Sequence, residues 1–431
     1  MGAQLVQDLN RGGSSRRVAG SMFIVAVLLG ACTASPGASG GSEIPPSIPV
    51  ASPGSMAPPE LSPSPSMSPE AAWTTIDWAA SDPAPFSGPG NQYVFGGAAW
   101  AGGAVLVGEE APLPSGNVEG VVWFSADDAH WQRTPNTDGT FSGSEIEAVA
   151  VSGSRLVAIG YSRLEDNAST LTPPVGIAWT SSDGTHWRRS QDANGNLGNM
   201  ALHGVAAGPM GFVAYGNDLA GGAALAFSTD GVRWQREGTD ALFTDATIAG
   251  VTWTGRDFAA VGGHDVPQPS GVTSQTHGDA AAWWSSDGQD WHPGDVGSTG
   301  YALETVQPWI DSLRATGVPP CPGCISAPAE WRSSDDGRTW RELPLPPTPD
   351  YPGLESLLVG QRLVSLQAQA ERVTWSAGGQ TWQDLTMTGS PIPDTAQLMV
   401  AAGQTVIAIA GVTGTSANDQ EDARVYAGQL H

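Results

Sequence analysis

Few side chains in this sequence have the type and spacing of a catalytic, redox or metal-binding site. Cys321 and Cys324 form a C-x-x-C pair in a proline-rich stretch, for which a zinc site, a redox dithiol and a disulfide are the alternatives. Zinc needs two further ligands, and no second cysteine pair exists. A redox dithiol is expected in a thioredoxin-like βαβ context, which the surrounding sequence lacks. We therefore expect a local disulfide, as in exported chains.

Histidine and aspartate gather in one long insert, which contains His264, Asp265, His277 and Asp279. These are metal-ligand types, but their spacing is irregular and matches no common site. We expect solvated loop residues here, with no bound metal and no cofactor.

The charge balance excludes one class of partner. The chain has 431 residues, a formal net charge of -25 and no lysine, so arginine and histidine supply all basic side chains. Such an acidic surface repels phosphate backbones, and nucleic-acid binding is not expected.

The N-terminus has the pattern of an export signal. Arg11, Arg16 and Arg17 precede a 14-residue apolar stretch, which is short for a membrane span and ends Leu29-Gly30-Ala31-Cys32. This ending resembles the lipobox of bacterial lipoproteins, which implies cleavage before Cys32 and lipidation of its thiol. Residues 1–32 are thus expected to be a signal peptide that leads to a lipid-anchored protein at the cell surface or in the periplasm.

The rest of the chain divides in two. Residues 33–70 are rich in Ser, Pro, Ala and Gly, and they have too few apolar side chains to fold. We expect a tether that spans on the order of 35 Å. Residues 71–431 form the body.

The body contains six related segments. They end at Trp131, Trp187, Trp234, Trp291, Trp340 and Trp382, which are separated by 56, 47, 57, 49 and 42 residues. Periods of this size indicate propellers and related arrays.

Each segment is expected to contain a hairpin. A two-residue type I′ turn needs positive φ at both central positions, which Asp-Gly supplies. The turn residues, each with the tryptophan that follows, are Asp183, Gly184 and Trp187; Asp230, Gly231 and Trp234; Asp287, Gly288 and Trp291; and Asp335, Gly337 and Trp340.

A strand pair precedes each hairpin, for example residues 145–151 and 155–160, so the repeating unit has four antiparallel strands. Such units suit the blades of an all-β propeller. The last unit has only three strands, and residues 72–77 form a lone strand that can complete it and close the ring. Seven blades follow from that count, and six are the alternative.

The hairpin motif resembles the Asp-box of BNR repeats in sialidase-like propellers, Ser-x-Asp-x-Gly-x-x-Trp. Residues 333–340 match it fully, while the other five copies depart from it. The resemblance implies a propeller fold and structural turns on the face away from a site.

A sialidase of this family also needs an arginine triad, a Tyr/Glu nucleophile pair and an acid/base Asp. The arginines here follow the repeat tryptophans, as Arg133 and Arg236 do, or lie at turns, as Arg155 and Arg256 do. We therefore expect no sialidase activity, although the sequence leaves a divergent glycosidase open as an alternative.

Function is expected on the opposite face, where long inserts gather with aromatic residues of the inter-blade connections: Phe86, Phe141, Phe243, Tyr301 and Tyr351. Two interpretations remain open for these aromatics, namely packing at blade seams and a ligand surface. The overall expectation is a monomeric binding module for an envelope glycan or protein, with an envelope assembly factor as a further alternative.

Overall fold

The computed structural model describes residues 72–112, 117–162, 175–190, 195–236, 242–265, 277–297, 302–318, 329–343, 356–367, 371–379, 381–413 and 421–431. Across these ranges the chain forms β-strands and one short 3-10 helix, η1 (Ala84–Phe86). No helix in this part of the chain has the length and apolar character needed to cross a membrane.

Five sheets contain four antiparallel strands each, and in all five the spatial order follows the chain order. The first comprises β2 (Gly90–Trp100), β3 (Gly103–Pro112), β4 (Glu119–Ser125) and β5 (Trp131–Arg133). The second comprises β6 (Ser144–Ser152), β7 (Arg155–Ser162), β8 (Gly176–Ser181) and β9 (Arg188–Arg189). The third comprises β10 (Met200–Gly208), β11 (Gly211–Asp218), β12 (Ala223–Ser228) and β13 (Gln235–Arg236).

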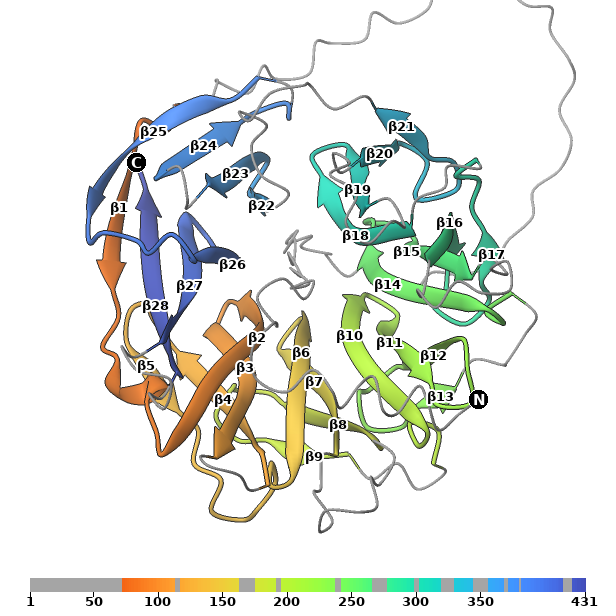
Figure 1. The fold of residues 1–431 in the computed structure, drawn as a ribbon, viewed down its shortest axis with the longest axis horizontal. Coiled ribbons are helices and arrows are strands. Elements are labelled where there is room, and N and C mark those ends of the chain that lie inside the picture. The colour runs from red at the N-terminus through yellow and green to blue at the C-terminus, as the bar shows by residue number, and fades with distance from the viewer. Residues whose placement is uncertain are drawn as a thin grey trace, which may run out of the picture.

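The fourth sheet comprises β14 (Ala246–Trp253), β15 (Phe258–Asp265), β16 (His277–Ser285) and β17 (His292–Pro293). The fifth comprises β18 (Ala302–Trp309), β19 (Ser312–Val318), β20 (Ala329–Ser333) and β21 (Arg341–Leu343). These elements confirm the repeating four-stranded unit. Figure 1 shows the sheets arranged in a ring, with the first strand of each sheet nearest the centre.

The remaining strands form one eight-stranded sheet in the order β22-β23-β24-β25-β1-β28-β27-β26. Its strands are β22 (Ser356–Val359), β23 (Arg362–Gln367), β24 (Arg372–Ser376), β25 (Gln383–Gly389), β1 (Thr75–Ala80), β26 (Gln397–Ala402), β27 (Thr405–Thr413) and β28 (Glu421–Leu430). The N-terminal strand β1 pairs antiparallel with β28, where Ile76 lies opposite Leu430. The predicted closing strand is therefore confirmed, a few residues later in the chain than expected. β1 also pairs in parallel with β25, a contact that the sequence did not predict.

The inner strands share a β-bulge. In six of them the register shifts by one residue near the start of the strand, as between Ile146 and Ala148 in β6. In five of the six, a glycine of the neighbouring strand lies opposite the bulge, and a Cβ at Gly160 would overlap the carbonyl oxygen of Glu145. A bulge changes the direction of the side chains next to it. The extra residue of each strand, such as Glu147, therefore departs from the regular alternation of side chains between the two faces of the sheet.

The hairpin turns differ from the predicted type I′. Gly184, Gly231, Gly288 and Gly337 have positive φ, whereas Asp183, Asp230, Asp287 and Asp335 do not. The turn is longer than two residues, and side chains stabilise it: Asp183 Oδ1 accepts the backbone N–H of Thr185 and His186, and Ser181 Oγ accepts that of Gly184. In a two-residue type I′ turn, backbone N–H groups bond to carbonyls across the hairpin. Here the aspartate carboxylate accepts the backbone N–H groups of the turn instead.

These turns also join neighbouring sheets. A Cβ at Gly184 would lie 2.7 Å from Trp100 and 2.8 Å from Phe124, both in the preceding sheet. Within the turn, the indole N–H of Trp187 donates to the Gly184 carbonyl at 2.9 Å, and Trp234, Trp291 and Trp340 repeat this bond. Glycine is required here both for its positive φ and because the adjoining sheet leaves no room for a side chain.

Candidate functional site

The two ends of the strands differ in character. Because consecutive strands are antiparallel, the hairpin turns described above lie at one end of each sheet. The link between the second and third strands lies at the other end, together with the return to the next sheet. We call this second end the connection face; Ser162 and Gly176 mark it in the second sheet.

Three of the five aromatics expected on this face are buried, which favours seam packing over a ligand surface for them. Phe86, Phe141 and Phe243 are 0%, 2% and 6% exposed. Their rings pack on Trp123, Trp179 and Trp283, with centroid distances of 5.4, 6.1 and 5.6 Å. Each fills the seam between two sheets, where burying an aromatic ring stabilises the fold, so none is available to a ligand. Tyr301 and Tyr351 lie outside the described residues.

A different set of side chains gathers on the connection face, around the start of β6. Glu147, the bulge residue, is half-buried and hydrogen-bonds both Glu145 and Tyr161. Burial and the neighbouring Glu145 carboxylate raise the pKa of the Glu147 carboxyl well above its usual value. Glu109 of the preceding sheet adds to this effect. The carboxyl of Glu147 is therefore harder to ionise than that of an ordinary glutamate.

The neighbouring sheets extend this cluster. In the third sheet, the bulge residue His203 lies within hydrogen-bonding distance of Asn217, with 3.0 Å between Nε2 and Nδ2. Burial lowers the pKa of the His203 imidazole, and the charge of Glu145 opposes this shift. In the first sheet, burial and a hydrogen bond with Glu421 raise the pKa of Tyr93 to about 12. We call Tyr93, Glu109, Glu145, Glu147, Tyr161 and His203 the rim cluster.

The rim cluster offers hydroxyl, imidazole and carboxyl groups from three consecutive sheets. Such groups accept and donate hydrogen bonds to sugar hydroxyls or peptide amides. The Glu145–Glu147 pair does not have the geometry of a glycosidase, whose two carboxyls lie about 5–10 Å apart to admit substrate or water. These two are in direct hydrogen-bond contact.

The arginines lie largely where the sequence placed them. Arg133, Arg188, Arg189, Arg236 and Arg341 occupy the outermost strands. Arg314 and Arg332 are exceptions on β19 and β20, and both pair with buried Glu330 at 2.9 and 2.6 Å. Because each of these two guanidinium groups is already paired with Glu330, neither is available to bind the carboxylate of a substrate.

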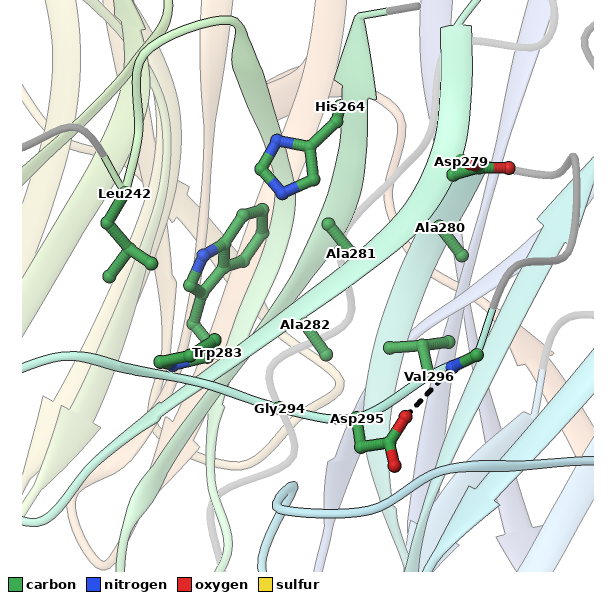
Figure 2. Close-up of a pocket in the computed structure, with 12 residues that line it drawn as sticks. Leu242, His264, Asp279, Ala280, Ala281, Ala282, Trp283, Gly294, Asp295 and Val296 are labelled. Atoms are coloured by element: carbon green, nitrogen blue, oxygen red, sulfur yellow. Dashed lines mark hydrogen bonds between the residues drawn. The ribbon is translucent and has the colours of Figure 1, made fainter.

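A cavity of about 370 Å³ opens on the fourth sheet, beside β16. Its wall includes Leu242, His264, Asp279, Ala280, Ala281, Ala282, Trp283 and residues 293–297. Figure 2 shows His264 above the indole of Trp283, in an edge contact with a centroid distance of 5.6 Å. His264 and Asp279, which the sequence grouped in a loop, thus lie in strands at this cavity.

No group of three or more His, Cys, Asp or Glu side chains within the described ranges is placed to hold a metal ion. The side chains of Asp265 and His277 lie outside the description, as do Cys32, Cys321 and Cys324.

Sequence reasoning missed the rim cluster. The segment Glu145-Ile146-Glu147 could have indicated it, because two acidic residues interrupt an otherwise apolar strand. Carboxylates are seldom buried unless they are paired with another group. The bulge that brings both glutamates together has no comparably clear pattern in the sequence.

No protein-family model matches this sequence, and no curated protein matches it. The structure is similar to solved β-propellers, including sialidase-like ones. A phage phi92 endosialidase has 11% identity and a TM-score of 0.43, over 83% of this chain and 70% of that one. YCF48 bound to a D1 peptide has 13% identity and a TM-score of 0.46, over 84% and 97%. The propeller domain of the Trilobed protease from Pyrococcus furiosus has 7% identity and a TM-score of 0.45, over 80% and 97%. The ring of four-stranded antiparallel sheets described above makes this chain a β-propeller.

Proposed function

We propose that this propeller is a lipid-anchored, extracytoplasmic binding module that recognises a neutral or amino-sugar glycan through the rim cluster. The observation that carries the proposal is the hydrogen-bonded group of Glu145, Glu147 and Tyr161 on the connection face. We count seven blades, because the eight-stranded sheet divides into two groups of four between β25 and β1. We assign the hairpin turns as Asp-boxes.

The chemistry of the rim cluster supports a glycan over an anionic ligand. Carboxylates accept hydrogen bonds from sugar hydroxyls, and they attract the ammonium of an amino sugar. They repel the carboxylate of a sialic acid, and the net charge of -25 adds to that repulsion.

Binding without hydrolysis is favoured over the glycosidase alternative. The contact between Glu145 and Glu147 leaves no space for a water molecule or an anomeric carbon between them. A divergent glycosidase would require a second carboxyl at the proper separation, which this pair does not provide.

The test is an array of neutral, amino and sialylated glycans probed with the purified protein. We expect binding to neutral or amino sugars, and a loss of about tenfold in Tyr161→Phe and in Glu147→Gln, since each removes roughly one hydrogen bond to the ligand. Glu342→Gln, on the exposed strand β21, is the control for a change of charge and should bind normally. An empty array, or release of fluorogenic aglycones by the native protein, would overturn the proposal.

A further inference from the structure

The inner strand β2 carries two partly accessible aromatic rings near the connection face. Asn91, Tyr93 and Phe95 are half-buried, and they alternate with the buried residues Gln92 and Val94. The three therefore share the side of β2 that solvent reaches. The rings of Tyr93 and Phe95 are nearly parallel, with an interplanar angle of 9° and a centroid distance of 6.3 Å. We call these two rings the aromatic pair.

Among the described residues of the inner strands, aromatic rings near the connection face occur in β2 alone. Trp100, Trp253 and Trp309 end their strands at the opposite face, beside the hairpin turns. The aromatics of the connections differ as well, because Phe86 and Phe141 are fully buried at seams. The aromatic pair thus adds accessible rings to a cluster of carboxyl, imidazole and hydroxyl groups.

The aromatic pair lies next to Glu147. Phe95 is the extra residue of the bulge in β2, the position that Glu147 takes in β6. The two bulges are in contact, since a Cβ at Gly96 would lie 3.1 Å from the carbonyl oxygen of Glu147 and 3.2 Å from Cα of Ala148. Figure 1 shows β2 and β6 as neighbours near the centre of the ring. An aromatic surface and a carboxyl therefore lie side by side at the rim.

Hydrogen bonds fix the ring of Tyr93. Asn91 Nδ2 donates to the Tyr93 hydroxyl oxygen at 3.0 Å, and the main-chain N–H of Glu421 donates to Asn91 Oδ1 at 2.9 Å. The side chains of Tyr93 and Glu421 are also hydrogen-bonded. Glu421 begins β28 in the eight-stranded sheet, so two sheets orient this ring. A surface that is ordered before binding loses little conformational entropy when a ligand arrives.

Such a surface suits the ring of a pyranose sugar. The face of an aromatic ring carries partial negative charge and attracts the weakly positive C–H groups of the sugar. Where the substituents of the sugar are equatorial, its axial C–H groups form an apolar patch on each face, and its hydroxyls point outward around the edge. A sugar stacked on Phe95 would therefore direct hydroxyls toward the neighbouring carboxyl of Glu147, which can accept and donate hydrogen bonds.

The linkage between sugars decides whether such an apolar face stays open. In a β-1,4-linked chain of glucose-type sugars, both linkage oxygens are equatorial, so every unit keeps its apolar faces and the chain is extended. An α-1,4 linkage places an axial oxygen on one face and curls the chain. A stacking surface therefore favours the β-linked chain.

We propose that the aromatic pair stacks on the sugar rings of a β-1,4-linked glycan of glucose or glucosamine type, whose hydroxyls hydrogen-bond the Glu145–Glu147 pair. The ligand class follows from an apolar ring surface beside carboxyl groups. This assignment rests on the proposed glycan binding and narrows its ligand to one linkage and one arrangement of hydroxyls.

Two probes of equal composition test the linkage. Cellotetraose and maltotetraose are both tetramers of glucose, with β-1,4 linkages in the first and α-1,4 linkages in the second. Calorimetric titration of the full-length protein should show about tenfold tighter binding of cellotetraose. Equal affinity for the two would overturn the stacking proposal and leave the proposed glycan binding intact. Binding of neither would also overturn it, and the glycan array decides whether the proposed function falls with it.

Variants of Phe95 test the ring itself. Phe95→Leu keeps an apolar side chain but removes the ring. It should weaken cellotetraose binding about fivefold and leave maltotetraose unchanged, so that the preference falls to about twofold. Phe95→Tyr keeps the ring and should retain both the affinity and the preference.

Phe124→Leu is the matched control. Phe124 is half-buried against Trp100 at the hairpin end of the same sheet, with a centroid distance of 6.0 Å. This variant should bind both tetramers as the native protein does. An equal loss in Phe124→Leu and Phe95→Leu would assign the effect to a loosened sheet and overturn the proposal. If Glu147→Gln loses cellotetraose but Phe95→Leu binds it normally, stacking is wrong although the rim cluster still binds the glycan.

Discussion

The indole N–H of Trp179 donates a 2.9 Å hydrogen bond to the main-chain carbonyl of Thr140, which holds the ring of Phe141 against Trp179 at the seam between two sheets. Trp123 makes the same bond with the carbonyl of Pro85, next to Phe86. A connection aromatic and a third-strand tryptophan therefore form a repeated unit that joins one blade to the next.

Phe141→Ala should destabilise the protein by about 3–5 kcal/mol, because it removes a fully buried ring and leaves a cavity. Met210→Ala, at a turn residue that is 53% exposed, should change stability by no more than about 0.5 kcal/mol. Denaturant unfolding measures both values. Similar small losses in the two variants would show that Phe141 does not support the seam.

Gly184→Ala and Gly153→Ala form a matched pair for the turn glycines. Both positions have positive φ, but a Cβ at Gly184 meets Trp100 and Phe124, whereas a Cβ at Gly153 meets nothing within 4 Å. Gly153→Ala should cost about 1 kcal/mol from backbone strain alone. Gly184→Ala should cost about 1–3 kcal/mol more because of overpacking. Equal melting temperatures would contradict the interlocking of turn and sheet.

The pH dependence of stability should report on Glu147. Its pKa is raised in the folded protein, so the folded state retains a proton that the unfolded chain releases. The associated stability is fully present below the ordinary value of 4.5 and is lost as pH rises from there through the folded pKa. Glu147→Gln cannot ionise, so its stability relative to the native protein should increase over that interval. Chemical denaturation of both proteins across a pH series measures this difference, and a difference that stays constant with pH would contradict the role of Glu147.

Two truncations distinguish the contribution of residues 1–71 from that of the closing strand β1. Removal of residues 1–71 should leave the unfolding temperature unchanged, because β1 begins at Thr75. Removal of residues 1–80 should lower it and should cause self-association, since the edges of β28 and β25 would both be exposed. Calorimetry and light scattering on the two truncated proteins distinguish these outcomes. A monomeric, equally stable shorter form would mean that β1 is dispensable.

Cys32→Ser tests the anchor. If Cys32 carries the lipid, the variant should move from the membrane fraction to the soluble fraction, because the lipid alone holds the body at the membrane. Fractionation followed by mass measurement of the mature N-terminus gives the result. Retention in the membrane would contradict the lipobox assignment.

Local patterns predicted the scaffold well. The strand pairs and the closing strand follow from apolar runs and turn residues, which are properties of neighbouring positions. The turn type was wrong because Asp183 stabilises its turn through a side-chain bond that propensity does not reveal. The sequence left two interpretations open for Phe141, because burial at a seam depends on how one sheet packs on the next. The rim cluster was missed for the same reason, since Glu109 and His203 come together with Glu145 only when three sheets stand side by side.

The position of β1 between β28 and β25 has a mechanical consequence. A pull on the chain N-terminal to Thr75 acts along the axis of β1, while its hydrogen bonds to both neighbours lie across that axis. Such a load acts in shear, so the bonds resist together and do not open one at a time as in a zipper. A load applied through β1 is therefore resisted by main-chain hydrogen bonds on both of its sides, to β25 and to β28.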